Sequence, residues 1–267
     1  MRPLLWRCRC SSFSTILLLP TAHAFAVARI TRPSRGSTVT TTSRWQSSSN
    51  HQDGNQLDCI DSLQQDYFAL RHGQSLANVA GIIMSNPAQA CTNYGLSDTG
   101  KEQATAAAQD VRQVFEKNDY DALVLLTSDL RRAKETAMIV GEKNSILPIH
   151  QKQVIIETRL RERWFGEWDG TSDDNYHKVW KDDALDASHE IKGVESVKDV
   201  MDRTTKCILE WDELLASEYS NRCLVILAAH GDVLQILQTA FEKMDGRLHR
   251  TLPHLETAQL RQLHLSS

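Results

Sequence analysis

The 267-residue sequence lacks features that would assign it to several special classes of protein. It has no run of roughly 20 apolar residues, so the mature protein is not expected to span a membrane. Its formal net charge is −4, without the excess of Lys and Arg typical of nucleic-acid-binding proteins, so no nucleic-acid partner is expected. With 41% hydrophobic and 24% charged residues, the composition indicates a soluble globular protein.

Cysteines and histidines with metal-ligand spacing are also missing. Cys8 and Cys10 lie near the N-terminus, and the remaining four cysteines are scattered along the chain and are predicted to be reduced thiols: Cys59, Cys91, Cys207 and Cys223. The sequence therefore predicts no metal site and no cofactor, and it carries no indication of oligomeric state.

Acidic residues are absent before Asp53, whereas seven arginines and many Ser and Thr residues occur in the same stretch. This composition is typical of a targeting presequence. The apolar segment 16–19, the small-x-small sequence Ala22-His23-Ala24 and the following Phe25 resemble the two-part plastid presequence of algae with complex plastids. We therefore expect residues 1–60 to be a plastid-targeting presequence and disordered linker, with a mitochondrial presequence as the alternative, and residues 61–267 to form one domain.

The remainder of the chain alternates short apolar runs with amphipathic helical patterns, which is typical of an α/β domain with a mostly parallel sheet. Ser97 is positioned to cap the first long helix. Expected strands span residues 67–70, 123–126, 154–156, 224–228 and 258–265, and expected helices span residues 97–116, 131–140, 197–215 and 232–241. The predicted fold is a three-layer α/β/α domain with a mostly parallel central sheet.

Two histidines directly follow predicted strands. Arg71-His72-Gly73 comes after the first strand, and His230-Gly231 comes after a later one. Ligands of open α/β folds bind beyond the carboxyl ends of the strands, so the two imidazoles are expected to meet over one crevice. A glycine after each histidine lets the backbone approach an anion closely, and a helix N-terminus favours negative charge.

Arginine is predicted to reach the same edge from residues 127–133, which join another strand to a helix. A phosphoryl group in transfer spreads negative charge over three oxygens, and the planar guanidinium group matches such oxygens. Arg71 and Arg132 are therefore candidate phosphate ligands. Their positive charge is expected to lower the pKa of His72 and keep its ring neutral, which makes it a candidate nucleophile.

Glu162 is the candidate proton donor for the departing oxygen. It lies in the aromatic-rich segment 160–170, where burial would raise the pKa of its carboxyl group. A histidine nucleophile needs such an acid because an alkoxide is a poor leaving group.

Four sequence blocks, in order, resemble the signatures of the histidine phosphatase (phosphoglycerate mutase-like) superfamily. They are Leu70-Arg71-His72-Gly73-Gln74-Ser75 with Asn78, Ser128 to Ala137, Leu160 to Gly170, and Ala229-His230-Gly231. The resemblance implies a phosphoglycerate mutase-like fold and a phosphohistidine on His72. It also implies a phosphate pocket formed by Arg71, Arg132 and His230, with Glu162 as the proton donor. Further substrate-binding residues are predicted to be Asn78, Gln74, Ser75, Gly231 and Arg163.

Three functions are consistent with these residues. The first hypothesis is a phosphatase that hydrolyses a small phosphorylated metabolite. The second is a mutase that moves a phosphoryl group within a sugar acid, and the short segment between Glu162 and His230 disfavours it because a smaller cover admits water. The third is a catalytically silent protein that binds a phosphorylated ligand, although such family members typically lose a catalytic residue and this chain has lost none.

Several polar residues outside the blocks are assigned no catalytic role. Asp182, Asp183 and Asp186 are predicted to form a solvated face. His254 and Glu256, which precede the last strand, are left outside the catalytic set.

Overall fold

A single mixed sheet organises the part of the chain that the structure describes, residues 54–267 of a computed structural model. The predicted presequence falls largely on residues 1–53, which lie outside the described residues. The five strands are arranged in the order β3-β2-β4-β1-β5, and β5 is antiparallel to β1 whereas the other neighbours are parallel. Their bounds are β1 Asp66–Arg71, β2 Leu123–Thr127, β3 Ile149–Ile156, β4 Leu224–Ala229 and β5 Leu260–Leu263.

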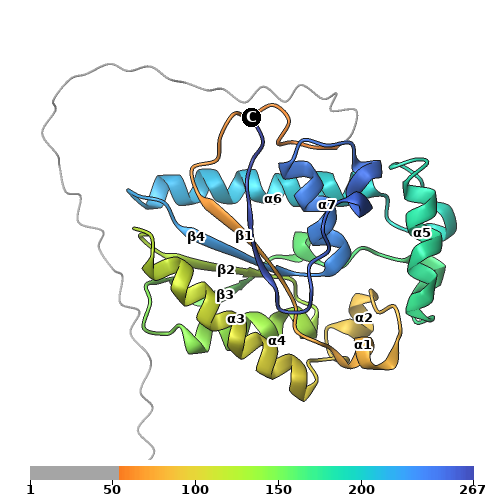
Figure 1. The fold of residues 1–267 in the computed structure, drawn as a ribbon, viewed down its shortest axis with the longest axis horizontal. Helices are drawn as coiled ribbons and strands as arrows, with labels where there is room; N and C mark the ends of the chain where they lie inside the picture. The colour runs from red at the N-terminus through yellow and green to blue at the C-terminus, as the bar shows by residue number, and fades with distance from the viewer. Residues whose placement is uncertain (1–53) are drawn as a thin grey trace, which may run out of the picture. The chain divides into compact units, whose positions relative to one another are not determined.

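Helices cover both faces of this sheet (Figure 1). The helices are α1 Leu76–Ala80, α2 Pro87–Ala90, α3 Asp98–Glu116, α4 Arg131–Lys143, α5 Tyr176–Asp183, α6 Val197–Glu218 and α7 Gly231–Phe241. Helices α3 and α4 pack on one face and α6 and α7 on the other, while α1, α2 and α5 lie beyond the carboxyl ends of the strands. The predicted three-layer α/β/α fold is therefore confirmed.

Successive side chains of a strand pack into two separate cores, one on each face of the sheet. In β1, Tyr67 and Ala69 pack with α6 and α7, whereas Phe68 and Leu70 pack with α3 and α4. Every residue of β4 is buried, as expected for a parallel strand covered on both faces. Between Gly54 and the C-terminus, no helix combines the length and apolar character needed to cross a membrane.

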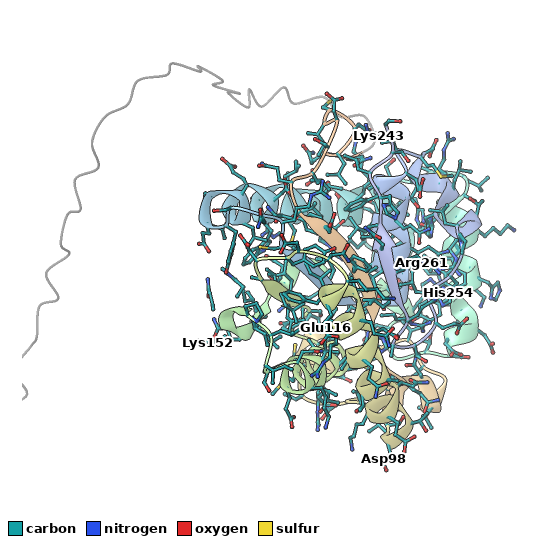
Figure 2. All side chains as sticks on the ribbon, turned by 60° about the vertical axis from the view of Figure 1, so that its left-hand side comes forward. Asp98, Glu116, Lys152, Lys243, His254 and Arg261 are labelled. Atoms are coloured by element: carbon teal, nitrogen blue, oxygen red, sulfur yellow. The ribbon has the colours of Figure 1, made fainter. Side chains whose placement is uncertain are left out.

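Serine caps fix where the two longest helices begin. The side chain of Ser97 accepts a hydrogen bond from the backbone N–H of Gly100, as predicted for the start of α3. Ser196 caps α6 in the same way by accepting from the backbone N–H of Asp199. Figure 2 marks the two ends of α3 by its terminal residues, Asp98 and Glu116.

The third and last strands differ from their predicted bounds because the backbone departs from regular extension near them. Strand β3 begins at Ile149 rather than at residue 154, and Gln151 and Lys152 within it have φ angles of 51° and 54°. These residues interrupt the alternation of side chains, so only residues 154–156 look strand-like in the sequence. Strand β5 is shorter than residues 258–265, and Ala258 before it has a φ of 56°.

The folded domain includes residues 54–60, which the sequence analysis placed in the linker. Leu57 is completely buried in the core beneath α6 and α7. The side-chain amide of Asn55 donates to the carbonyl of Ala240 at 3.0 Å, and the backbone N–H of Gln56 donates to Thr205 Oγ1 at 3.2 Å. The expected boundary at residue 61 is therefore too late in the chain.

Leu57→Ala should reduce the free energy of unfolding by about 3 kcal/mol, because it leaves a cavity in a closed core. Urea denaturation followed by circular dichroism measures the change. Leu185→Ala is the matched control and should cost less than about 0.5 kcal/mol, since Leu185 is exposed. Equal stability of the Leu57→Ala variant and the wild-type protein would contradict the assignment of this segment to the domain.

Candidate active site

The two histidines predicted to meet do lie together at the carboxyl ends of β1 and β4. The strands pair in parallel with Arg71 opposite Ala229, and the backbone N–H of His72 donates to the carbonyl of Ala229 at 3.0 Å. The imidazole rings of His72 and His230 are 5.2 Å apart between centroids, in an edge-to-face arrangement. Both side chains are buried.

The hydrogen bonds of His72 define its tautomer. Its Nδ1 lies 2.8 Å from the carbonyl oxygen of Gly73, which can only accept, so Nδ1 carries the proton. Its Nε2 therefore carries no proton, and the lone pair of this atom accepts a hydrogen bond from Arg132 Nε at 3.0 Å. Burial, reinforced by the positive charges of Arg132 and Arg71, holds the pKa of His72 well below its usual value. The neutral ring therefore presents Nε2 as a nucleophile.

The loop after His72 is fixed against α3 and α4. The backbone N–H of Gly73 donates to Thr136 Oγ1 at 3.1 Å. A Cβ atom added at Gly73 would lie 2.4 Å from the carbonyl oxygen of Gly100, so a side chain there would push the loop away from α3. The backbone N–H of Gln74 donates to Gln103 Oε1 at 2.8 Å, which ties the same loop to α3.

Three buried nitrogen atoms around the histidines have no hydrogen-bond partner within residues 54–267. They are Arg71 Nε, Arg132 Nη1 and His230 Nδ1. Buried polar atoms without partners cost free energy, and a tetrahedral oxyanion would supply the acceptors that the two guanidinium groups lack. The cluster is therefore suited to bind a phosphoryl group.

Glu162 completes the group from the loop that follows β3. Its Oε2 lies 3.7 Å from Arg132 Nη2 and 3.9 Å from His230 Nδ1, and its Oε1 accepts from the backbone N–H of Arg163 at 3.0 Å. Burial raises the pKa of Glu162 to about 7, although Arg132 opposes the rise. A carboxyl group with such a pKa can both donate and accept a proton near neutral pH.

These side chains border a cavity of about 220 Å³. The predicted site residues that line it are Arg71, His72, Asn78, Arg132, Glu162 and Gly231. At Gly231, an added Cβ atom would lie 3.3 Å from Arg71 Nε, so glycine allows Arg71 to approach the start of α7. His230 is not among the lining residues, but its ring contacts that of His72, and its unpartnered Nδ1 lies 3.9 Å from Glu162 Oε2.

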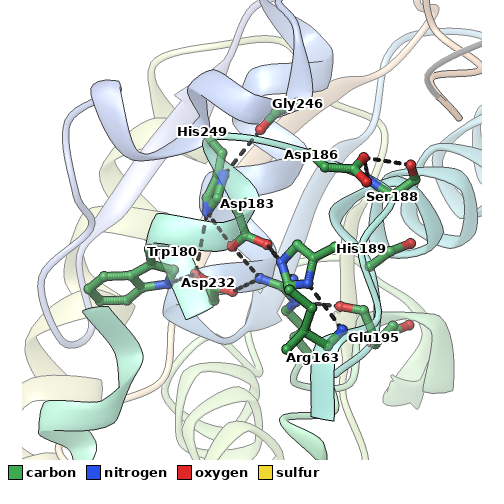
Figure 3. A network of polar contacts seen from close by, with 12 residues as sticks. Arg163, Trp180, Asp183, Asp186, Ser188, His189, Glu195, Asp232, Gly246 and His249 are labelled. Atoms are coloured by element: carbon green, nitrogen blue, oxygen red, sulfur yellow. Dashed lines mark hydrogen bonds and ion pairs between the residues drawn. The ribbon is translucent and has the colours of Figure 1, made fainter. Parts of the chain in front are cut away.

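Three residues predicted to bind substrate lie outside the cavity lining. Gln74 Oε1 accepts from the hydroxyl of Ser97, and Ser75 is buried as the N-cap of α1, where its side chain binds the backbone N–H of Asn78. Arg163 is completely buried, and its guanidinium group pairs with Asp183 and Asp232 (Figure 3). Gln74 and Ser75 therefore stabilise the loop after His72. Arg163 stabilises the segment that carries Glu162 from the protein interior.

The structure also adds cavity residues that the sequence analysis did not select. They are Ile82, Met84, Asp173, Tyr176, Trp180, Asp232, Arg250 and His254. Asp232 stands directly after His230-Gly231, a position that could have identified it. Tyr176 and Trp180, spaced by four residues on α5, stack with their ring centroids 5.3 Å apart and could have been recognised as one helix face.

One interpretation of a polar residue needs correction, and one residue outside the predicted site is found at the cavity. Asp183, predicted to be solvated, is completely buried because it pairs with Arg163. His254, left outside the catalytic set, lines the cavity, and its Nε2 lies 2.7 Å from Arg71 Nη1. Arg261, beside His254 in Figure 2, donates to the carbonyl of His254 at 2.9 Å and so helps to hold this segment.

A metal centre is not part of this arrangement: from residue 54 onward, no three or more His, Cys, Asp or Glu side chains are grouped so that they could hold a metal ion. The phosphate ligands that the site offers are guanidinium and imidazole groups.

The sequence profile of the histidine phosphatase superfamily (branch 1) matches residues 67–267. The chain belongs to the histidine phosphatase superfamily. It is 36% identical over 184 residues to a glucosyl-3-phosphoglycerate phosphatase of Mycolicibacterium vanbaalenii, covering 64% of this chain and 71% of the relative. It is 33% identical to the enzyme of the same name from Mycobacterium tuberculosis, covering 66% and 74% of the two chains.

Comparison of structures and of more distant sequences agrees with this assignment. A mycobacterial glucosyl-3-phosphoglycerate phosphatase in complex with VO3 superimposes with a TM-score of 0.58 and 29% identity, covering 74% of this chain and 92% of that one. A 2,3-bisphosphoglycerate-dependent phosphoglycerate mutase 2 of Lactiplantibacillus plantarum is 28% identical over 66% of this chain and 83% of its own. The phosphatase interpretation is thus supported, and the mutases are more distant relatives.

At pH 6.5, where an unperturbed imidazole is about half protonated, His72 should remain neutral with its proton on Nδ1. Long-range ¹H–¹⁵N correlation spectra, assigned with His72→Ala, report both the charge and the tautomer. In urea-unfolded protein the same ring should titrate normally. A doubly protonated His72 at pH 6.5, or a proton on Nε2, would contradict the proposed nucleophile.

Proposed function

We propose that the protein is a phosphatase that hydrolyses small phosphomonoesters through a covalent phosphohistidine on His72. The observation that carries this proposal is the tautomer of His72: its ring is neutral and its unprotonated Nε2 lies beside Arg71 and Arg132, which have unpartnered donors. Such a site attracts the anionic ester and leaves the attacking nitrogen free of a proton.

In the first step, the Nε2 lone pair of His72 attacks phosphorus and the bond between phosphorus and the ester oxygen breaks. Arg71, Arg132 and His230 interact with the three phosphoryl oxygens as charge redistributes. The proton of Glu162 passes to the departing oxygen, so that an alcohol leaves rather than an alkoxide. Glu162 ends this step as a carboxylate.

In the second step, the Glu162 carboxylate takes a proton from water while the water oxygen attacks phosphorus. The bond between phosphorus and His72 Nε2 breaks, inorganic phosphate forms, and neutral His72 and protonated Glu162 are restored. A pKa of about 7 allows Glu162 to serve in both directions.

Hydrolysis is favoured over mutase activity by the closer phosphatase relatives and by the short segment between Glu162 and His230. A silent binding role is disfavoured because His72, Arg132 and Glu162 are all present and Arg132 contacts both of the others. The names of the relatives point to a phosphorylated sugar acid as one substrate class for testing. The small cavity is suited to a small phosphorylated metabolite.

Purified protein should release phosphate from phosphomonoesters in the presence of EDTA, and His72→Ala should lower turnover by about a thousandfold or more while retaining the fold. The wild-type enzyme should also form a phosphoprotein that is stable to base and labile to acid. With 3-phosphoglycerate as a probe, formation of 2-phosphoglycerate would identify a mutase. A correctly folded protein that releases no phosphate from any ester of a broad panel would overturn the proposal.

We also propose that the presequence, which precedes the folded domain and so falls within residues 1–53, directs the protein to a plastid, on the basis of the arginines, the lack of acids before Asp53 and the Ala22-His23-Ala24 sequence. A fluorescent protein fused after residue 53 should accumulate in plastids of an alga with complex plastids. A matched fusion with the seven arginines changed to Gln should not. Accumulation in mitochondria would support the alternative targeting.

A further inference from the structure

A buried network of charges surrounds Arg163, the residue after Glu162, and includes Asp183 and Asp232 (Figure 3). Asp232 also lines the cavity and so connects this network to it. Asp232 is the second residue of α7 and is buried. Its Oδ1 accepts from Trp180 Nε1 at 2.9 Å, and its Oδ2 lies 3.3 Å from Arg163 Nη1. Asp232 is thereby fixed between helix α5 and the segment that carries Glu162.

Arg163 holds Glu162 and Asp232 at the same time. Its backbone N–H donates to Glu162 Oε1, and its side chain pairs with Asp232. Because the Arg163 guanidinium is also locked to Asp183 by two contacts of 2.7 Å, it has little freedom to move. The separation of the two carboxyl groups is therefore set by one rigid residue, and both groups border the same cavity.

We propose that Asp232 is a positioning residue that acts through Glu162: together with the burial of Glu162, its fixed negative charge helps to keep Glu162 protonated in the resting enzyme. This inference rests on the proposed function, in which Glu162 must hold a proton for the leaving group. It also explains a feature of the cavity that phosphate binding does not require, namely a buried carboxylate beside a site for an anion.

Asp232 retains its own charge despite its burial. Burial alone would raise its pKa, but the positive charge of Arg163, with His249 and Arg250, lowers the pKa of Asp232 below its usual value. The hydrogen bond from Trp180 further stabilises the carboxylate. Of the two carboxyl groups, Glu162 therefore holds a proton more readily than Asp232 does.

The other groups that face Glu162 come from every element around the cavity. Arg132 from α4 and Arg71 from β1 favour the ionised form of Glu162, and Arg163 donates to it from its own segment. His72 and His230 are neutral because burial and the arginines lower the pKa of each. Tyr176 from α5 is neutral as well, since burial raises its pKa. Asp232 thus supplies the negative charge that opposes the two arginines.

Opposing effects therefore set the protonation state of Glu162. Two arginines are needed for the phosphoryl group, yet they draw the proton away from the acid that the same reaction needs. Burial of Glu162 and the charge of Asp232 act in the opposite direction and raise the pKa of Glu162. Removing the charge of Asp232 should therefore shift Glu162 toward the carboxylate without removing any phosphate ligand.

Infrared titration of the carboxyl C=O stretch of Glu162, identified by subtracting the spectrum of Glu162→Gln, tests this directly and requires no turnover. In Asp232→Asn the titration midpoint of Glu162 should fall by about half a unit or more. Asp183→Asn is the matched control, because Asp183 contacts the same Arg163 but does not line the cavity, and it should shift the midpoint less than Asp232→Asn does. Circular dichroism checks that each variant is folded, and Asp232→Ser replaces the asparagine variant if that one does not fold.

Kinetics then separates this inference from the proposed function. With an alkyl phosphate, the alkaline limb of kcat/KM should move to lower pH in Asp232→Asn by the same amount as the infrared midpoint, since Glu162 must be protonated to donate. An unchanged infrared midpoint in a folded Asp232 variant, or an equal shift in Asp183→Asn, would overturn the role of Asp232 whatever the activity. Absence of turnover in the wild-type protein would instead overturn the phosphatase assignment.

Discussion

The parallel pairing of β1 with β4 is the constraint on which the site depends. The register that places Arg71 opposite Ala229 lets the backbone of His72 bind the carbonyl of Ala229 and brings the ring of His230 against that of His72. Strand β2 pairs with β4 and β3 pairs with β2, so the loops that carry Arg132 and Glu162 open at the same edge. Strand pairing therefore brings these groups to one edge of the sheet, beyond the carboxyl ends of the strands.

Burial then gives these groups the protonation states that phosphoryl transfer requires. The same desolvation that lowers the pKa of His72 raises the pKa of Glu162, because each residue is pushed toward its uncharged form. The neutral imidazole can attack and the neutral carboxyl group can donate. The permanently charged guanidinium groups of Arg71 and Arg132 cannot respond in this way, and buried atoms of both lack partners among residues 54–267. Ligand binding can recover the free energy that these unpartnered atoms cost.

The sequence was sufficient for groups whose position is set locally. His72 and His230 follow the ends of buried strands and Arg132 lies at the start of the helix after another strand, so their place at one sheet edge could be predicted. Ser97 marked the start of α3. The sequence was insufficient where a partner that is distant along the chain determines whether a side chain is buried. Asp183 looked solvated among neighbouring charges, but Arg163, which lies in another segment, buries it. The start of β3 was hidden because left-handed residues at 151 and 152 break the alternation of side chains.

The position of Arg163 does not fit its predicted role as a substrate ligand. Glu162 lines the cavity, whereas Arg163 is completely buried and lies outside the lining, although an arginine next to a proposed proton donor resembles a phosphate ligand. A buried guanidinium needs carboxylate partners, and α5 and α7 provide them as Asp183 and Asp232. Helix α5 and the segment that carries Glu162, the proposed proton donor, are thus anchored to one buried ion cluster, so a change in this cluster acts on both.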